Sequence, residues 1–162
     1  MTDESAPDPE EFKDPLCDYA PASFDSHLQR ALAEEPVSAI QSQPFATVEL
    51  GATVREAVDL LRRLQVGSLL VVDDEGRLVG IFTERDVLER VVERYASLAE
   101  APVRDVMTSD PMIVYNHAPS ATALAAIAVA GYRHVPVLDE ADQLVGIVSP
   151  RRVFRFLESH FT

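Results

Sequence analysis

Apolar and polar positions follow a definite order along residues 45–96, and this order predicts a strand, a helix, two strands and a second helix. Two almost wholly apolar runs, 68–72 and 78–82, flank the polar segment 73–77. Such a pattern is typical of a β-hairpin whose strands are covered on both faces. Residues 45–50 are a short candidate for the first strand.

Both helices of this stretch are predicted by apolar residues at helical spacing. Thr53 and Glu56 form a capping box at the start of the first helix, and the second helix starts after Thr83 and runs toward Ala96. The residues expected to face inward are Val54, Ala57, Val58, Leu61 and Leu64 in the first helix, and Val87, Leu88, Val91, Val92 and Tyr95 in the second.

The same order of elements returns in the second half of the chain. The predicted elements are strands at 113–115, 134–138 and 144–148 and an alanine-rich helix at 120–130. Ser149 followed by Pro150 suits the N-cap and the first position of a last helix. That helix is expected to be buried through Val153, Phe154, Leu157 and Phe161.

The similarity between the two halves is a sequence repeat. A shift of 66 residues lays Val37–Ala96 over Val103–Thr162 without a gap, with twelve identities in sixty positions. A unit of about 60 residues has a marginal core when it is alone, so we expect the two copies to pack as a pair. The predicted fold class is α+β, with two β-α-β-β-α units related by a pseudo-twofold axis. The predicted domains are an acidic disordered tail at 1–25, a helical lead-in at 26–36, a first repeat at 37–96, a linker at 97–102 and a second repeat at 103–162.

The net charge of −13 is concentrated at the start of the chain. Residues 1–36 hold ten acidic groups against Lys13 and Arg30, a balance of −8, and the repeats carry the other −5. Prolines among these acids predict that the tail is disordered. Because phosphate backbones and anionic lipids require a basic face, the composition disfavours nucleic acid and membrane as partners. It leaves room for one small basic pocket.

The sequence favours a cytoplasmic protein without catalytic or metal chemistry. No apolar run approaches the ~18 residues that span a bilayer, and the acidic start is unlike a secretory signal. The single cysteine, Cys17, excludes an internal disulfide and a thiolate metal cluster. The four histidines are scattered along the chain, lack metal-ligand spacing and form no catalytic constellation with Cys17. We therefore expect no enzyme, no cofactor and no metal site.

Two motifs connect the chain with a known family. The segment Val103-Arg104-Asp105-Val106-Met107-Thr108 precedes a first strand, and Leu-Val-Gly-Ile follows the acidic turn of each repeat. With the order of elements, they make residues 37–162 resemble tandem CBS domains, also called a Bateman module. The resemblance implies a regulatory module that binds an adenine nucleotide in a cleft between the repeats, forms a homodimer through helices of the repeats, and signals to a regulated protein whose identity is unknown.

The family's ribose motif is found in the first repeat. Gly80-Ile81-Phe82-Thr83-Glu84-Arg85-Asp86 has its glycine, hydroxyl and carboxylate at the motif's positions, so the resemblance implies that Thr83 and Asp86 bind ribose. A carboxylate can accept hydrogen bonds from both ribose hydroxyls. The same two residues also fit a simple helix-capping pair, and the two roles can coexist.

The second repeat departs from the motif in a consistent way. Arg152 stands where the first repeat has Asp86, and Arg133-His134 replaces Gly67-Ser68. Arginine cannot accept a hydrogen bond from ribose. This division resembles one CBS pair of the AMP-activated kinase γ subunit, which implies that Arg133, His134, Arg151 and Arg152 hold the nucleotide phosphate. The alternative is an ion pair between Asp86 and Arg152 beside a solvated Arg133.

The resemblance implies adenine contacts near the first strand and the start of the second. The corresponding residues are Ala46, Val48, Val66 and Leu69. AMP is the favoured ligand, with ADP or ATP next, and one inter-repeat cleft is expected to be competent. The alternative function is a ligand-free interaction and dimerisation module whose acidic tail binds a basic partner.

Overall fold

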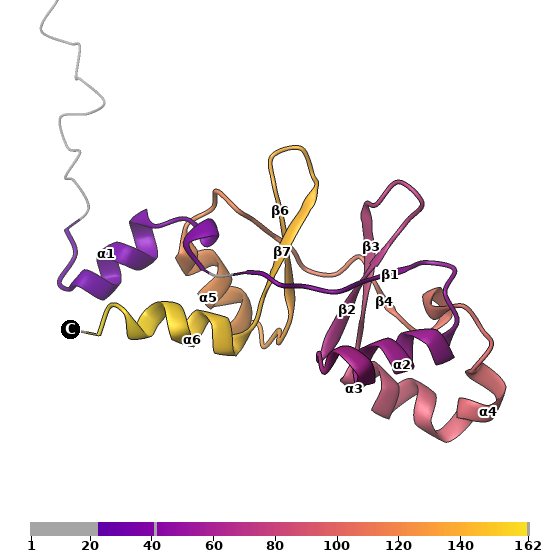
Figure 1. Ribbon diagram of the computed structural model, residues 1–162. Helices are drawn as coiled ribbons and strands as arrows, with labels where there is room; N and C mark the ends of the chain where they lie inside the picture. The colour runs from indigo at the N-terminus through magenta and orange to yellow at the C-terminus, as the bar shows by residue number, and fades with distance from the viewer. Residues whose placement is uncertain (1–22, 41, 162) are drawn as a thin grey trace, which may run out of the picture.

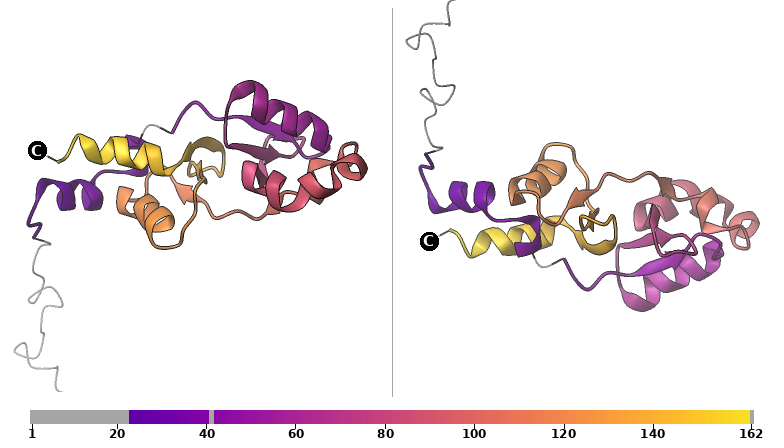
Figure 2. Two further views of the ribbon diagram at one scale, coloured as in Figure 1. Left: turned by 90° about the horizontal axis from the view of Figure 1, so that it is seen from below. Right: turned by 90° about the horizontal axis from the view of Figure 1, so that it is seen from above.

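The computed structural model describes residues 23–40 and 42–161, which fold as two similar units side by side (Figures 1 and 2). Each unit has one sheet and helices that pack against it, as the predicted α+β class requires. The predicted tail at 1–25 lies almost entirely outside the described residues. Within the described part of the chain, no helix combines the length and apolarity needed to cross a membrane.

The first unit contains a four-stranded sheet in the order β1-β2-β3-β4. Strand β1 is parallel to β2, and the other neighbouring strands are antiparallel. The elements are β1 (Thr47–Glu49), α2 (Val54–Leu64), β2 (Ser68–Val72), β3 (Leu78–Thr83), α3 (Glu84–Asp86), η3 (Val87–Val91), η4 (Val92–Arg94), α4 (Tyr95–Leu98), η5 (Val103–Asp105) and β4 (Thr108–Ser109).

The second unit contains a three-stranded sheet in the order β5-β6-β7, with the same parallel and antiparallel neighbours as β1-β2-β3. Helix α1 and the short helix η2 precede the first unit in sequence but belong to the core of the second. The elements are α1 (His27–Glu34), η2 (Val37–Ala39), β5 (Val114–Tyr115), α5 (Ser120–Ala128), β6 (Val135–Leu138), β7 (Leu144–Val148) and α6 (Pro150–Glu158).

An equivalent aspartate stabilises the turn of each hairpin. Asp73 Oδ1 accepts hydrogen bonds from the backbone N–H groups of Glu75 and Arg77, and Asp139 Oδ1 accepts equivalent bonds in the second unit. A short polar side chain that binds the backbone two residues ahead stabilises a turn. The repeated aspartate is therefore a structural residue, and the two predicted hairpins are confirmed.

The units exchange the segments that precede their first strands. The Val37 N–H donates to the Ala118 carbonyl oxygen at 2.7 Å, and the Val103 N–H donates to the Ala52 carbonyl oxygen at 2.7 Å, which is the same bond after a shift of 66 residues. Both valines have no exposed surface. Val37 lies in the core of the second unit and Val103 in the core of the first, so each core is completed by a segment from the other repeat.

A third apolar cluster joins the two sheets. Leu70 and Ile81 from the first unit meet Ile147 from the second, with Leu78 and Leu144 packed at the sides. Leu70 points toward this cluster, while its neighbours Leu69 and Val71 lie in the core of the first unit. Because alternate residues of a strand point to opposite faces, β2 is buried on both sides. This explains its unbroken apolar sequence.

The helix predicted from Thr83 toward Ala96 is wrong as a single helix. It starts with the three-residue α3, continues through a π-helical turn in η3 and a 3-10 turn in η4, and ends with α4. A uniform 3.6-residue period does not describe such a segment. Leu88 and Val92 are 69% and 55% exposed, and only Val91 of the predicted inward residues is buried.

Three further residues that were predicted to be buried are exposed. Leu64 is 48% exposed because it lies at the last turn of α2, beside the left-handed C-cap Gln65. In α6 the buried residues are Val153 and Phe156, and Phe154 points outward. Phe161 follows the helix and is also exposed. The other predicted helices and strands are present with ends shifted by a few residues.

Helix α1 is held against the second unit by polar contacts. Ser26 caps its start, and the Ser120 hydroxyl donates to the Ala31 carbonyl oxygen at 3.2 Å. At the end of α6, His160 Nε2 lies 2.9 Å from the Glu35 carboxylate and Nδ1 lies 2.8 Å from the Phe156 carbonyl oxygen. A neutral imidazole can donate from only one nitrogen, so these two acceptors raise the pKa of His160.

The glycine shared by the two Leu-Val-Gly-Ile motifs permits the exchange of segments. A methyl group on Gly146 would lie 2.5 Å from Cβ of Ser42, and one on Gly80 would lie 3.0 Å from the carbonyl oxygen of Thr108. Both neighbours belong to the crossing segments. A side chain at either position would therefore push a crossing segment away from its strand.

Gly146→Ala should destabilise the protein by about 1–3 kcal/mol, the usual cost of overpacking a core. Chemical denaturation monitored by circular dichroism measures the change. Gly51→Ala is the matched control, because a methyl group at Gly51 has no neighbour within 4 Å. Equal stability of the two variants would contradict the close approach at Gly146.

Candidate functional site

Asp86, the predicted ribose ligand, is the last residue of α3, at the start of the helical segment that continues through η3 and η4 to α4. It is only 6% exposed. Strand β3 ends at Thr83, whose extended backbone and hydroxyl form the N-cap of α3, and Asp86 follows three residues later. The sequence therefore places a carboxylate in the first turn, where unpaired backbone N–H groups favour a negative charge.

The two carboxylate oxygens of Asp86 have different partners. Oδ2 accepts from the Thr83 N–H and hydroxyl, both at 2.8 Å, and completes a capping box. Oδ1 has two longer contacts, one with the Thr108 hydroxyl at 3.4 Å and one with the Arg90 guanidinium at 3.4 Å. Hydrogen bonds of this length are weak. A ligand would therefore displace the partners of Oδ1 more easily than those of Oδ2.

Of the alternatives for Asp86, the capping pair is present and the ion pair with Arg152 is wrong. The charged partner of Asp86 is Arg90, one turn further along the same segment. Arg152 instead donates to the carbonyl oxygens of Ile147 and Pro44. Asp86 and Arg152 therefore serve separate sides of the pseudo-twofold arrangement.

His134 from the second unit lies directly over Gly67 of the first. A methyl group on Gly67 would lie 3.3 Å from the His134 ring and 3.4 Å from the Glu84 carboxylate. Thus Glu84, at the first position of α3, and His134, immediately before β6, meet over the same glycine. Gly67 and the residue before His134 are equivalent positions of the repeat, so this contact lies near the pseudo-twofold axis.

The electrostatic surroundings of His134 favour its neutral form. Burial is the largest cause that lowers the pKa of His134, Glu84 opposes this effect, and the charges of Arg133 and Arg152 add to it. Arg152 is half-buried, and burial followed by repulsion from Arg155 lowers its pKa.

The other two predicted phosphate ligands lie at the surface. Arg133 and Arg151 are exposed, and neither has an ion pair among the described residues. Arg133 thus lies at the surface next to His134. No contact links Arg151 with either residue within the described part of the chain.

The predicted adenine residues fall into two groups. Val48 and Leu69 are 8% and 0% exposed and lie in the core of the first unit. Ala46 and Val66 are half-buried at the edge of that core. The Ala46 carbonyl oxygen accepts from the Leu70 N–H at 2.9 Å.

Sequence reasoning missed Glu84, Arg90 and Thr108 as partners of the predicted site. The i,i+4 spacing of Asp86 and Arg90 is a sequence signal for an ion pair on a helix. The contact of Thr108 with Asp86 depends on strand β4 from the crossing segment, and the position of Glu84 depends on the packing of the two units. Neither has a local signal in the sequence.

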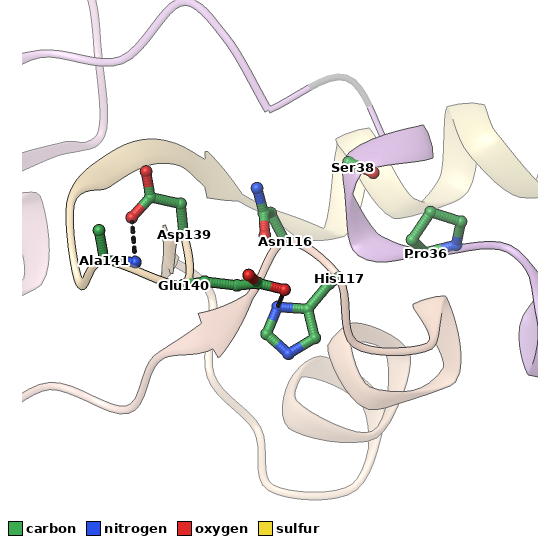
Figure 3. A pocket seen from close by; sticks show the side chains of 7 residues that line it. All are labelled: Pro36, Ser38, Asn116, His117, Asp139, Glu140 and Ala141. Atoms are coloured by element: carbon green, nitrogen blue, oxygen red, sulfur yellow. Dashed lines mark hydrogen bonds and ion pairs between the residues drawn. The ribbon is translucent and has the colours of Figure 1, made fainter.

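Two pockets among the described residues are considered, and neither is lined by Asp86 or His134. The larger, of about 540 Å³, lies at the turn between β6 and β7 and is lined by Pro36, Ser38, Asn116, His117, Asp139, Glu140 and Ala141 (Figure 3). Its acidic side chains are unsuited to an anion. The smaller, of about 360 Å³, lies between α6 and the segment before β1. No group of three metal-ligating side chains is found among the described residues.

The repeat agrees with the comparison with known protein families. A model of the CBS domain matches residues 37–93 and 103–159. The chain belongs to the CBS domain family. Apart from the exchanged segments, the two matched CBS domains correspond to the two units of the fold, paired as in a Bateman module. No catalytic domain accompanies them in the described part of the chain.

Relatives of the CBS pair include small proteins and larger enzymes. An uncharacterised 17.7 kDa protein of Acidianus ambivalens is 34% identical over 121 residues, which cover 75% of this chain and 72% of that protein. An inosine-5'-monophosphate dehydrogenase of Methanocaldococcus jannaschii is 27% identical over 133 residues, which cover 82% of this chain and 26% of the enzyme. The chain spans about a fifth of three CBS domain-containing proteins of Arabidopsis thaliana.

Two solved structures with this fold contain AMP. CBSX2 in complex with AMP has a TM-score of 0.67 and 26% identity, covering 76% of this chain and 96% of CBSX2. The CBS domain protein PAE2072 of Pyrobaculum aerophilum, complexed with AMP, has a TM-score of 0.66 and 26% identity, covering 76% of this chain and 98% of PAE2072.

The contacts of His134 and His160 predict opposite titration behaviour. Burial should hold the pKa of His134 below the usual value of about 6.5, whereas the two acceptors should hold the pKa of His160 above it. Proton NMR titration measures both values, with His134→Gln and His160→Gln used to assign the signals. Glu84→Gln should lower the pKa of His134 further and leave that of His160 unchanged. A pKa of His134 equal to or above that of His160 would contradict the described contacts.

Proposed function

We propose that this CBS pair is a regulatory module that binds one adenine nucleotide, AMP by preference, between Asp86 of the first repeat and His134 of the second. The observation that carries the proposal is the buried carboxylate of Asp86, two residues after Glu84, which lies with His134 of the second repeat over Gly67. Complexes of CBSX2 and PAE2072 with AMP support the choice of ligand. ADP or ATP is the next candidate.

Asp86 and Thr83 would bind the ribose. Oδ2 of Asp86 keeps its capping bonds, and Oδ1 exchanges its two 3.4 Å contacts for a ribose hydroxyl. The Thr83 side chain already holds the carboxylate in position through a 2.8 Å bond. The exchange replaces weak contacts with a charge-assisted hydrogen bond, which favours binding.

His134 and Arg133 would surround the phosphate, and Arg151 and Arg152 would add positive charge from further away in the second repeat. The approach of a phosphate favours the protonated form of His134, because an opposite charge stabilises a cation. Glu84 shares the space over Gly67 with His134, so its carboxylate must turn away when an anion binds. Repulsion from Glu84 grows with ligand charge, which favours a monophosphate over a triphosphate.

The adenine ring would rest against the half-buried side chains of Ala46 and Val66. Val48 and Leu69 would support this surface from the core behind it, since their own side chains are buried. The second repeat offers no equivalent ribose acceptor, because Arg152 has only donors. We therefore assign one nucleotide site to each chain.

The signal to a partner would pass through a homodimer, and the proposal places this protein in the cytoplasm. Exposed apolar side chains lie along the segment from η3 to α4 in the first unit and on or shortly after helices α5 and α6 in the second; they are Leu88, Val92, Tyr95, Val129, Tyr132, Phe154 and Phe161. Exposed apolar surface of this kind favours association. Dimerisation would also suit the alternative function, an interaction module without a ligand, and the regulated partner is a protein that recognises one ligand state.

Asp86→Ala should weaken AMP binding about 10- to 100-fold, because a hydrogen bond to a charged group contributes about 1.5–3 kcal/mol. Isothermal titration calorimetry measures the change. Glu56→Ala is the matched control, since it removes the acidic residue of another capping box in the same repeat. Both variants lose a helix cap, and only Asp86→Ala should lose AMP. Unchanged binding by Asp86→Ala, or no binding of AMP below millimolar by the unaltered protein, would overturn the proposal.

Leu88→Asp should shift the protein from dimer to monomer in light scattering coupled to size exclusion. The change places a charge on a side chain that is 69% exposed in one chain and would be buried between two. Met112→Asp is the control, because Met112 is 39% exposed but lies outside the helices. A monomeric unaltered protein, or equal behaviour of the two variants, would contradict dimerisation through the helices.

A further inference from the structure

A contact between α1 and the end of α6 takes the place of a chain connection that the first repeat has. The shift of 66 residues aligns His160 with Arg94 and Glu35 with Ala101. In the first repeat, Arg94 and Ala101 belong to one continuous segment, which runs from η4 through α4 toward η5. In the second repeat, the same two positions are 125 residues apart in sequence and meet where α6 lies beside α1 (Figure 2).

Helix α1 depends on its attachment to the second repeat. It has eight residues, and an isolated helix of that length is marginal in water. Ala31 is 4% exposed and Leu32 packs against the core of the second unit. The carbonyl oxygen of Glu35 accepts from the Ser120 N–H at 2.8 Å, which fixes the end of α1 at the start of α5. The contacts at this end therefore decide how firmly α1 is held.

The imidazole of His160 has a hydrogen-bond acceptor at each nitrogen. Nε2 lies 2.9 Å from the Glu35 carboxylate, and Nδ1 lies 2.8 Å from the Phe156 carbonyl oxygen. The side chain is only 19% exposed, so water replaces these partners with difficulty. A protonated imidazole donates from both nitrogens, whereas a neutral one donates from one. Only the protonated form therefore satisfies both contacts.

Two uncharged groups of α6 complete the surroundings of the imidazole. The ring centroids of Phe156 and His160 are 4.8 Å apart, and an aromatic ring attracts a cation beside it. The Ser159 hydroxyl lies 3.0 Å from Nδ1 but donates to the Phe156 carbonyl oxygen at 2.7 Å. Its hydrogen is thus directed away from Nδ1, and neither group stabilises the neutral imidazole in this arrangement.

Glu35 is the charged group that faces His160 from α1. Glu34 and Glu158, the neighbouring acids of the two helices, are exposed. The bond to the Phe156 carbonyl oxygen and the bond to Glu35 raise the pKa of His160, and burial opposes them. The contact is therefore complete below the usual histidine pKa of about 6.5 and is lost as pH rises through the raised pKa of the folded protein.

We propose that His160 makes the attachment of α1 to the second repeat sensitive to pH. In its protonated form, His160 joins Glu35 to the end of α6 and holds α1 in place. Without the proton, one nitrogen faces an acceptor with no hydrogen between them, so α1 separates from the repeat more often. Each opening exposes Ala31, Leu32 and the surface that they cover. No residue of the nucleotide site takes part, so the response does not require AMP.

Hydrogen exchange of residues 27–35, followed by mass spectrometry at about pH 5.5 and about pH 8.5, measures the attachment on either side of the usual histidine pKa. Protection factors correct for the direct effect of pH on the intrinsic exchange rate. Protection of α1 should fall about two- to tenfold at the higher pH, the usual effect of losing one hydrogen bond. Protection of α2 should stay constant, which shows that the repeats remain folded.

His160→Gln should remove the difference between the two pH values, and Glu35→Gln should reduce it. His27→Gln is the matched control, because it makes the same substitution at an exposed histidine of α1 itself and should keep the difference. This role of His160 is refuted by equal protection of α1 at both pH values in the unaltered protein, by an undiminished difference in His160→Gln, or by its loss in His27→Gln.

Discussion

The exchange of segments between the two repeats is the constraint on which the rest of the structure depends. Val37 completes the core of the second unit and Val103 that of the first, and both are held by equivalent backbone hydrogen bonds. Neither repeat of about 60 residues has its full core without the other. The exchange fixes the two sheets against each other through Leu70, Ile81 and Ile147.

This pairing turns differences between the repeats into differences between two sides of one molecule. On one side the carboxylate of Asp86 is buried in a capping box, and His134 of the other repeat lies over Gly67. On the other side Arg152 binds two carbonyl oxygens and faces a pocket with Arg155. A nearly symmetric backbone therefore presents a hydrogen-bond acceptor at one position and positive charge at the equivalent one.

The hairpins and the paired α+β units could be predicted because their apolar runs, turn residues and repeat are local patterns. The capping pair of Thr83 and Asp86 could be predicted for the same reason. The broken helix after Thr83 could not be predicted, since its π and 3-10 turns depart from the 3.6-residue period on which the prediction relied. The contacts of Glu84 and Thr108 depend on which segments cross between repeats, and no spacing in the sequence encodes that choice.

A crystal structure of the protein grown with AMP tests the central claim most directly. The account predicts one nucleotide per chain, with a ribose hydroxyl within hydrogen-bond distance of Asp86 Oδ1, the phosphate beside His134, and the Glu84 carboxylate turned away from Gly67. AMP bound only in the pocket beside Arg152 and Arg155, or the Asp86 region unchanged at saturating AMP, would contradict it.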